Sequence, residues 1–274
     1  QNIQYNWPAL ERVPDILAEL AQVQMHAIQT SGNCVRNTTV DHLAGVAADE
    51  QVDPRPYAEL IRQWSTFHPE FAALPRKFKI ALSGATTDRA VVKAHDIGFN
   101  VRRNAAGEIG FEVFVGGGMG RTPVIGQRLR DWLPERDLLS YLDSMLRVYN
   151  LFGRRDNKYK ARIKILVREL GIDAYRDQVE RDWRVSADAS ASALTPQAID
   201  SIRAHFAAPV PALPDAPSLA ALIAGEGPAA ELLPADRPRF AAWLRRNTHD
   251  HRLAGLRAVS ISLKRPGVPP GDAT

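Results

Sequence analysis

The fold of this chain is decided by the stretch Leu74-Pro75-Arg76-Lys77-Phe78-Lys79-Ile80-Ala81-Leu82, which predicts a buried β-strand with positive charge on one face. Apolar residues recur at every second position, which sends Phe78, Ile80 and Leu82 to one face of the strand. Lys77 and Lys79 point together to the other face. Two ammonium groups that leave bulk water side by side need an anion, and each lowers the pKa of the other. This face therefore indicates a site for an anionic ligand.

The same spacing also has a purely structural explanation. An edge strand often carries lysines on its solvent face, where they prevent a second strand from pairing with it. Lys77 and Lys79 would then protect the edge of the sheet and bind nothing. The alternation alone slightly favours this explanation, so both stay open at this point.

The chain has 274 residues, of which 45% are hydrophobic, so it can form one large domain or two ordinary ones. No apolar run approaches the roughly 20 residues that a membrane helix needs, and the N-terminus lacks the features of a signal peptide. We therefore expect a soluble cytoplasmic protein without a membrane partner. The start at Gln1 and an end just after a predicted strand suggest a piece of a longer polypeptide.

Cys34 is the only cysteine, which excludes an internal disulfide and any site built on several thiolates of this chain. We expect a packed, inert thiol. The chain has 35 basic and 31 acidic residues, a net charge of only +4. Residues 154–168, however, contain seven lysines or arginines and one acid. This local charge indicates an anionic ligand more than the net charge does.

Apolar spacing predicts several helices. The first covers residues 13–28 and faces the core. The second follows the cap Asp53-Pro54 and buries a face made of Tyr57, Leu60, Ile61, Trp64 and Phe67. Further helices are predicted at about 124–132, 138–151, 157–170 and 174–183. In the helix at 157–170 the basic residues fill the polar side, which is typical of a solvated face.

A β-hairpin is predicted beside the lysine strand, with arms at 97–101 and 109–115 and the turn Asn104-Ala105-Ala106-Gly107. The second arm runs into Gly116-Gly117-Gly118-Met119-Gly120. Glycines allow a backbone to approach a ligand closely, but this spacing matches neither common phosphate-binding motif. A plain tight turn explains the run equally well.

The composition changes after residue 183, where alanine, serine and proline become frequent. This part predicts a linker with short helices near 195–206 and 218–224. A helix at 240–246 and a strand at 258–264 then indicate a new domain. We predict a first domain at 1–183, a linker at 184–236 and the start of a second, related half at 237–274.

Six segments, in order, resemble one family, the sirohaem-containing sulfite and nitrite reductases, and most closely the sulfite reductase haemoprotein. The segments are Thr30-Ser31-Gly32-Asn33-Cys34-Val35-Arg36-Asn37, Asp53-Pro54-Arg55-Pro56, His68-Pro69-Glu70-Phe71, Leu74-Pro75-Arg76-Lys77-Phe78-Lys79, Val115-Gly116-Gly117-Gly118 and Arg155-Asp156-Asn157-Lys158-Tyr159-Lys160-Ala161-Arg162. The resemblance extends over residues 1–183 and resumes in the last part of the chain.

The resemblance implies an α+β fold in which two related halves, each with a ferredoxin-like sheet and helices, enclose a sirohaem and a [4Fe-4S] cluster. This chain is similar to the first half, followed by the linker and the opening of the second. Arg36, Lys77 and Lys79 match the family's arginine and two lysines that bind the oxygens of sulfite or nitrite and assist their protonation. The candidates for holding the sirohaem are Arg36, Asn37, Arg76, Arg121, Lys158, Lys160 and Arg162.

The function implied is the six-electron reduction of sulfite to sulfide, and the alternative is the reduction of nitrite to ammonia. The electron donor is either a flavoprotein or ferredoxin. The family's four cluster cysteines lie in the second half and are absent here, so we expect this chain alone to be inactive. Two alternatives of another class are a structural subunit without catalysis and a basic module that binds nucleic acid. The latter lacks a base-reading motif and the aromatic residues that stack on bases.

Overall fold

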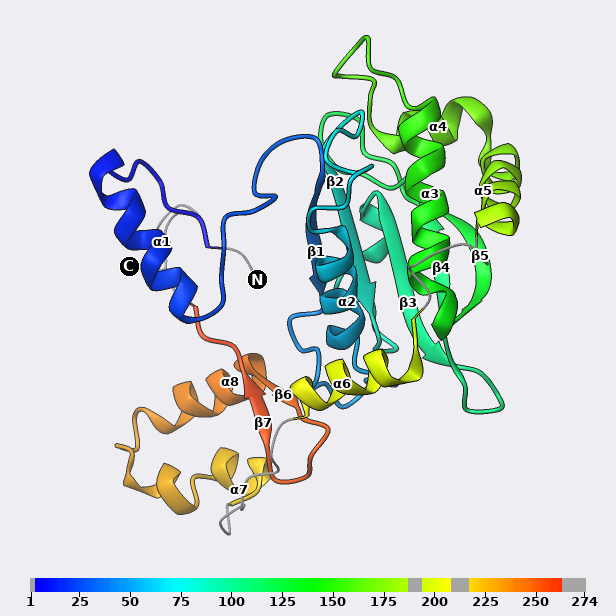
Figure 1. Ribbon diagram of the computed structural model, residues 1–274. Helices are drawn as coiled ribbons and strands as arrows, with labels where there is room; N and C mark the ends of the chain where they lie inside the picture. Colours follow the sequence, from blue (N-terminus) through cyan, green and yellow to red (C-terminus); the bar gives the residue numbers. More distant parts are fainter. Residues whose placement is uncertain (1–2, 187–193, 208–216, 263–274) are drawn as a thin grey trace. The chain divides into compact units, whose positions relative to one another are not determined.

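The computed structural model describes residues 3–186, 194–207 and 217–262, and Figure 1 shows its path. The chain divides into two compact units. The first consists of Gln1–Ala44 and Gln51–Ala207, and the second of Gly45–Glu50 and Ala208–Thr274. The domain boundaries expected from the sequence stay a prediction.

A mixed five-stranded sheet forms the centre of the first unit. Its strands are β1 (Val35–Val40), β2 (Phe78–Ser83), β3 (Ile97–Arg103), β4 (Ile109–Val115) and β5 (Gln127–Pro134). They lie side by side in the order of the sequence. The pairs β1–β2 and β2–β3 are parallel, whereas β3–β4 and β4–β5 are antiparallel. With its helices the sheet confirms the expected α+β class.

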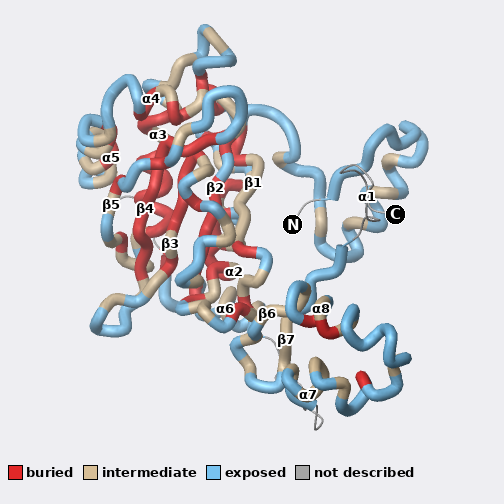
Figure 2. Tube along the Cα trace, turned by 180° about the vertical axis from the view of Figure 1, so that it is seen from behind, coloured by how far each residue is buried: buried red, intermediate tan, exposed pale blue. Residues whose placement is uncertain are grey.

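The core lies between one face of this sheet and a layer of helices (Figures 1 and 2). The helices of the first unit that contribute buried residues are α2 (Arg55–Ser65), α3 (Leu138–Phe152), α4 (Ile163–Leu170), α5 (Ile172–Ser186) and α6 (Pro196–Phe206). In the core, Tyr57 of α2 packs edge-on against Phe111 of β4, with ring centroids 5.1 Å apart. Short 3₁₀ turns lie at Leu10–Arg12, Val92–Ala94, Glu135–Asp137 and Gly227–Glu231.

The predicted hairpin is confirmed. Ile97 pairs with Val115 and Arg103 pairs with Ile109, and β3 also pairs with the lysine strand β2. In the turn, the Asn104 side-chain oxygen accepts the backbone N–H groups of residues 106 and 108 at 3.0 Å and 2.9 Å. The local turn chemistry of asparagine and glycine is sufficient to predict this element.

The helix predicted at 124–132 is wrong, because residues 127–132 belong to strand β5. Leu129 and Leu133 are both buried. They stand four residues apart, a spacing that a helix and a strand share. Pairing with the antiparallel neighbour β4 decides the conformation. The period of the sequence could not reveal that partner.

Two other helix predictions are wrong in part. The first helix, α1 (Val13–Gln22), ends before Gln24, whose φ is +59°, and none of its residues is buried. It therefore does not face the core as expected. Helix α2 ends at Ser65, and Phe67 lies beyond it with φ +59° and 80% exposure. Phe67 thus does not belong to the buried face of that helix.

The predicted helix at 157–170 is also too long. Helix α4 begins at Ile163, and Asn157 starts a turn instead. The Asn157 side chain accepts the backbone N–H of Tyr159 at 3.0 Å, while its carbonyl accepts that of Lys160 at 2.9 Å. Such local bonds compete with a helix. The basic residues 158, 160 and 162 therefore lie in a loop before α4.

The short helices predicted near 195–206 and 218–224 are confirmed as α6 and, in the second unit, α7 (Leu219–Ala224). Thr195 and Ser218 cap them by accepting backbone N–H groups at 3.2 Å and 3.1 Å. The second unit also contains α8 (Arg237–Asn247), which confirms the predicted helix, and the antiparallel strands β6 (Thr248–Asp250) and β7 (Arg257–Val259). The strand predicted at 258–264 is thus shorter, and residues 263 and 264 lie outside the described residues.

Candidate active site

The lysine strand β2 lies inside the sheet, between β1 and β3. An interior strand has no free edge to protect, so the edge-strand explanation of its lysines is wrong. Phe78, Ile80 and Leu82 are fully buried in the core, as their spacing predicts. Lys79 is exposed on the other face, and Lys77 stands half-buried just before the strand.

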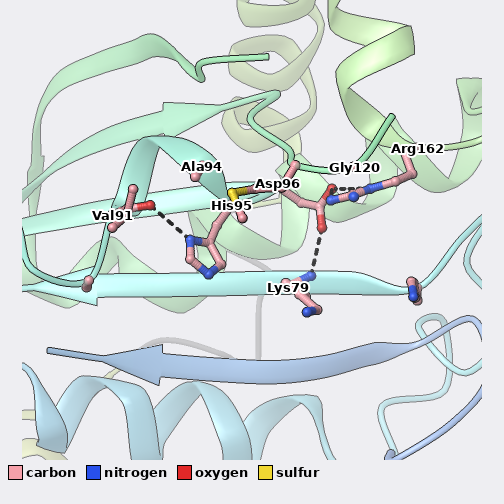
Figure 3. A pocket seen from close by; sticks show the side chains of 10 residues that line it. Lys79, Val91, Ala94, His95, Asp96, Gly120 and Arg162 are labelled. Carbon is pink, nitrogen blue, oxygen red and sulfur yellow. Dashed lines mark hydrogen bonds and ion pairs between the residues drawn. The ribbon is translucent and has the colours of Figure 1, made fainter. Parts of the chain in front are cut away.

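A cavity of about 440 Å³ lies beside the lysines (Figure 3). Its lining consists of Lys77, Lys79, Ala90, Val91, Ala94, His95, Asp96, Met119, Gly120 and Arg162. These residues come from β2 and the residue before it, from the segment before β3, from the glycine-rich run after β4 and from the loop before α4. The cavity therefore exists only when distant parts of the chain have folded together.

Asp96 joins two parts of the cavity wall, and its side chain is 1% exposed. Its Oδ2 accepts the backbone N–H of Lys79 at 2.9 Å. Its Oδ1 accepts the Nε–H and Nη2–H groups of Arg162 at 3.1 Å and 2.6 Å (Figure 3). Burial raises the pKa of this carboxyl, while the Arg162 guanidinium opposes the rise. Because all three partners are donors, the ionised carboxylate suits this position.

Two contacts fix the loop that carries Arg162. The hydroxyl of Tyr149, a buried residue of α3, donates to the carbonyl of Ala161 at 2.8 Å. On the other side, the backbone of Gly118 lies so close that an added Cβ would stand 3.4 Å from Arg162 Nη2. The glycine-rich run therefore serves close packing around this arginine.

Lys164, in the first turn of α4, is a second buried basic residue beside the glycine-rich run, with 8% exposure. Its Nζ donates to the carbonyl of Thr122, and an added Cβ on Gly118 would stand 3.0 Å from its Cδ. Burial lowers the pKa of Lys164, and the Arg162 charge lowers it further. The solvated face expected for this residue is thus wrong.

Several neighbouring cations act on the pKa of Lys77. Burial lowers its pKa, and the neighbouring cations lower it further. Together with Lys77 these cations form what we call the cationic cluster, namely Arg36, Arg76, Lys77, Lys79 and Arg162. Among the described residues, only Arg162 of this cluster has an acidic partner. Of these cations, Lys77 and Lys79 line the cavity without an acidic partner in the described parts of the chain. Such cations attract and stabilise an anion.

A family model matches the part of the chain that contains this cavity. The model, described as the nitrite and sulphite reductase 4Fe-4S domain, matches residues 31–186, a range that contains the whole sheet and the cavity. The chain belongs to the nitrite and sulphite reductase family. The expected resemblance is therefore confirmed.

Individual members of the family are similar along part of their length. Sulfite reductase (ferredoxin) 1 of Mycolicibacterium paratuberculosis (strain ATCC BAA-968 / K-10) is 32% identical over 204 residues, 74% of this chain and 36% of the relative. The ferredoxin–nitrite reductase of Leptolyngbya laminosa is 33% identical over 185 residues, 66% of this chain and 36% of the relative. The solved structure of the Mycobacterium tuberculosis NirA protein matches with a TM-score of 0.57 and 31% identity, over 64% of this chain and 32% of that one. The chain thus spans about a third of these relatives.

The structure brings part of the predicted nitrite and sulphite reductase site together. Arg36 and Asn37 lie on β1, where a register shift between Val35 and Asn37 interrupts the pairing and Asn37 stands opposite Lys79. The Arg36 guanidinium donates to the carbonyl of Thr30. Arg36 and Arg76 act on Lys77 through their charge, whereas Lys79 and Arg162 line the cavity itself.

Arg121, Lys158 and Lys160, like Arg36, Asn37 and Arg76, do not line the cavity. Arg121, Lys158 and Lys160 are exposed, and the Lys158 ammonium lies 5.2 Å from the ring centroid of its neighbour Tyr159. Arg121 directly follows Gly120, a lining residue. A role of these three side chains in holding a cofactor stays a prediction.

Sequence reasoning missed His95, Asp96 and Met119 as lining residues. His95 and Asp96 belong to no periodic pattern, and their position directly before a predicted strand is the one signal they give. Met119 lies in the glycine-rich run, whose glycines allow close approach to a ligand. Cys34 is buried as expected, its Sγ donates to the carbonyl of Ser31 at 3.4 Å, and burial raises the pKa of its thiol.

No group of three or more His, Cys, Asp or Glu side chains is arranged for a metal ion within the described residues. In the same residues, no helix has both the length and the apolar character to cross a membrane.

Proposed function

We propose that this chain supplies the substrate-binding face of an enzyme that reduces sulfite to sulfide, with nitrite reduction to ammonia as the alternative. The observation that carries this proposal is the cationic cluster, in which four of five cations lack an acidic partner among the described residues. Sulfite and nitrite are small oxyanions, and both gain electrons and protons and lose their oxygens as water when they are reduced. A cavity lined by ammonium and guanidinium groups suits either substrate.

The donor set also fits a sirohaem, whose carboxylates require cationic partners. Arg36, Arg76 and Arg162 offer guanidinium groups for carboxylates, and Asn37 offers a neutral donor. When bound, sirohaem would supply the iron at which electrons reach the substrate. The [4Fe-4S] cluster does not fit this chain, because such a cluster is held by four thiolates and the chain contains one cysteine. The two relatives described above are named for ferredoxin, which we propose as the electron donor.

The residues of this chain would bind and protonate the substrate. Each oxygen that leaves as water must receive protons, and a cationic acid near it both stabilises the anion and supplies a proton. Lys77 suits this role, because a lowered pKa makes its ammonium a better acid than an ordinary lysine. Lys79 is held at its backbone by Asp96, which keeps the second ammonium on the cavity side of β2.

The test uses the complete protein that contains this chain, purified with its cofactors. Oxidation of reduced methyl viologen is measured with sulfite and with nitrite, together with the absorption spectrum. Replacing Lys79 by alanine should lower kcat by about 100-fold, because one proton-donating cation is lost. The spectrum should keep its sirohaem bands, which separates lost chemistry from lost cofactor.

Lys93 provides the matched control, because it is exposed, lies near the cavity without lining it, and stacks on Phe114 at 4.7 Å. The Lys93→Ala protein should keep its activity. Equal loss in both variants, or a protein without sirohaem bands, would contradict the proposal. In the unchanged protein, the ratio of the activity with sulfite to the activity with nitrite shows which of the two anions is the substrate. The 274-residue chain alone should oxidise no methyl viologen with either anion, since it cannot hold the cluster.

A further inference from the structure

One wall of the cavity is the segment from Val91 to Asp96, and its backbone is unusual at its start. Val91 has φ +53° and ψ +52°, the left-handed region that a β-branched residue rarely adopts. The side chain of Val91 is 54% exposed, so its packing does not explain this conformation. Backbone strain of this kind is concentrated at functional sites, where it positions a neighbouring group.

The Val91 carbonyl receives two donors. The backbone N–H of Ala94 donates to it at 2.9 Å, which closes the 3₁₀ turn, and Nδ1 of His95 lies 3.0 Å from the same oxygen (Figure 3). A carbonyl can only accept, so the Nδ1 atom of His95 carries a proton. In the neutral ring, Nε2 is then without a proton. Among the described residues, no group forms a hydrogen bond with Nε2.

His95 lines the cavity, and its ring lies on the side of the lysine strand (Figure 3). The charged groups of the cavity around it are the ammonium groups of Lys77 and Lys79 from β2, the guanidinium of Arg162 from the loop before α4, and the buried carboxylate of Asp96. The three cations attract an oxyanion into the cavity. An oxyanion held among them lies beside the His95 ring and attracts a proton on Nε2, because opposite charges at short distance attract.

We propose that His95 is a further substrate-contacting residue, which takes up a proton from solvent when an oxyanion enters the cavity and donates Nε2–H to one of its oxygens. This inference rests on the proposed function, since it assumes that the cationic cluster binds an oxyanion. The carbonyl of the strained residue Val91 accepts the Nδ1–H group. Nε2 is therefore the ring atom that takes up the proton and donates it to the oxyanion.

The test measures sulfate binding to the 274-residue chain by titration calorimetry at pH 7.5, in two buffers that differ in ionisation enthalpy. Sulfate does not change its charge near this pH, so any proton taken up belongs to the protein. The chain should take up protons as sulfate binds. The His95→Asn variant should bind sulfate about tenfold more weakly, for the loss of one hydrogen bond to a charged group, and without that uptake.

His26 provides the control, because it is exposed and contacts Arg62 of α2, outside the cavity. The His26→Asn variant should bind sulfate with the affinity and proton uptake of the unchanged chain. Nitrogen NMR of the His95 ring should also show a neutral ring protonated at Nδ1 before sulfate is added. Circular dichroism of each variant checks that it is folded.

The outcomes separate the two proposals. If the unchanged chain binds no sulfate, both the anion site and the role of His95 are wrong. If sulfate binds and the His95→Asn variant keeps its affinity and its proton uptake, only the role of His95 is wrong. The same conclusion follows if Lys77→Gln, rather than His95→Asn, removes the uptake. A neutral ring protonated at Nε2 would also contradict the inference.

Discussion

The buried carboxylate of Asp96 binds the guanidinium of Arg162, which is 66 residues away in the sequence, with one distance of 2.6 Å. The same carboxylate accepts the backbone N–H of Lys79. One acidic group thus connects β2, the start of β3 and the loop before α4. It also compensates part of the positive charge of the cationic cluster, so that several cations can lie beside one cavity.

Replacing Asp96 by asparagine should destabilise the chain by about 3 kcal/mol, because it leaves the Arg162 charge without its partner at a largely buried position. Urea unfolding followed by circular dichroism measures this change. The control is Asp131→Asn, whose carboxylate is 82% exposed and pairs with Arg128 on the surface. That variant should unfold like the original chain. Equal urea midpoints for the Asp96 variant and the original chain would show that the ion pair of Asp96 and Arg162 does not stabilise the fold.

The pKa of Lys77 should rise when Arg36 is replaced by glutamine. Burial is the main cause of the lowered pKa and remains in this variant, but the charge of Arg36 is the largest of the neighbouring contributions and is lost. Carbon NMR of the lysine Cε, followed against pH, measures the change. Arg103→Gln is the control, because Arg103 lies at the far end of β3 and donates to the carbonyl of Gly107. An unchanged pKa of Lys77 in the Arg36 variant would contradict the conclusion that the charge of Arg36 acts on Lys77.

The lowered pKa of Lys77 also affects stability in a definite direction. Between the lowered pKa and the ordinary lysine value, the unfolded chain binds more protons than the folded chain. The contribution of Lys77 to the free energy of unfolding therefore increases as the pH rises through this window. This increase of the free energy of unfolding with pH should be smaller in the Arg36→Gln variant. The reason is that the pKa of Lys77 then lies closer to the ordinary lysine value.

Some elements of this fold could be predicted because their signals are local. The alternation in β2 identifies which residues enter the core, and the Asn104 turn identifies the hairpin. Strand β5 could not be predicted in this way, because Leu129 and Leu133 fit two periods and a pairing partner decides between them. Tertiary contacts of this kind override local propensity.

The candidate site shows the same division. Lys77 and Lys79 share a face by strand geometry alone, so their joint position could be read from the sequence. Asp96 has no periodic pattern around it, and its partners Lys79 and Arg162 come from distant segments. A buried carboxylate of this kind becomes visible only when the fold places its donors. The resemblance to a family implies a role for the two lysines but gives no indication of Asp96.

Replacing Val91 by asparagine should stabilise the chain by about 1 kcal/mol. Asparagine adopts the left-handed region more easily than a β-branched residue, and the exposed Val91 side chain loses little burial. The carbonyl that holds His95 is kept. Thermal unfolding measures the gain, and the control is Val185→Asn in α5, an exposed valine in a helix, which should change the midpoint very little. A lower midpoint for the Val91 variant would mean that its side chain stabilises the turn.

Replacing Gly117 by alanine should destabilise the chain by several kcal/mol and weaken sulfate binding, because the new methyl group has no space. A Cβ at this position would stand 2.2 Å from the carbonyl oxygen of Lys93 and 2.5 Å from that of His95. Both are backbone atoms, so the segment that forms the cavity wall would have to move. Urea unfolding and sulfate titration measure the two effects together.

The control for this change is Gly107→Ala in the hairpin turn, where an added Cβ meets nothing within 4 Å but φ is +82°. This variant should lose only about 1 kcal/mol, the cost of the left-handed backbone for alanine, and should bind sulfate normally. Normal sulfate binding by a folded Gly117 variant would show that the glycine-rich run can move away from His95 without disturbing the cavity. The contrast between the two glycines thus separates backbone strain from the close packing that shapes the cavity wall.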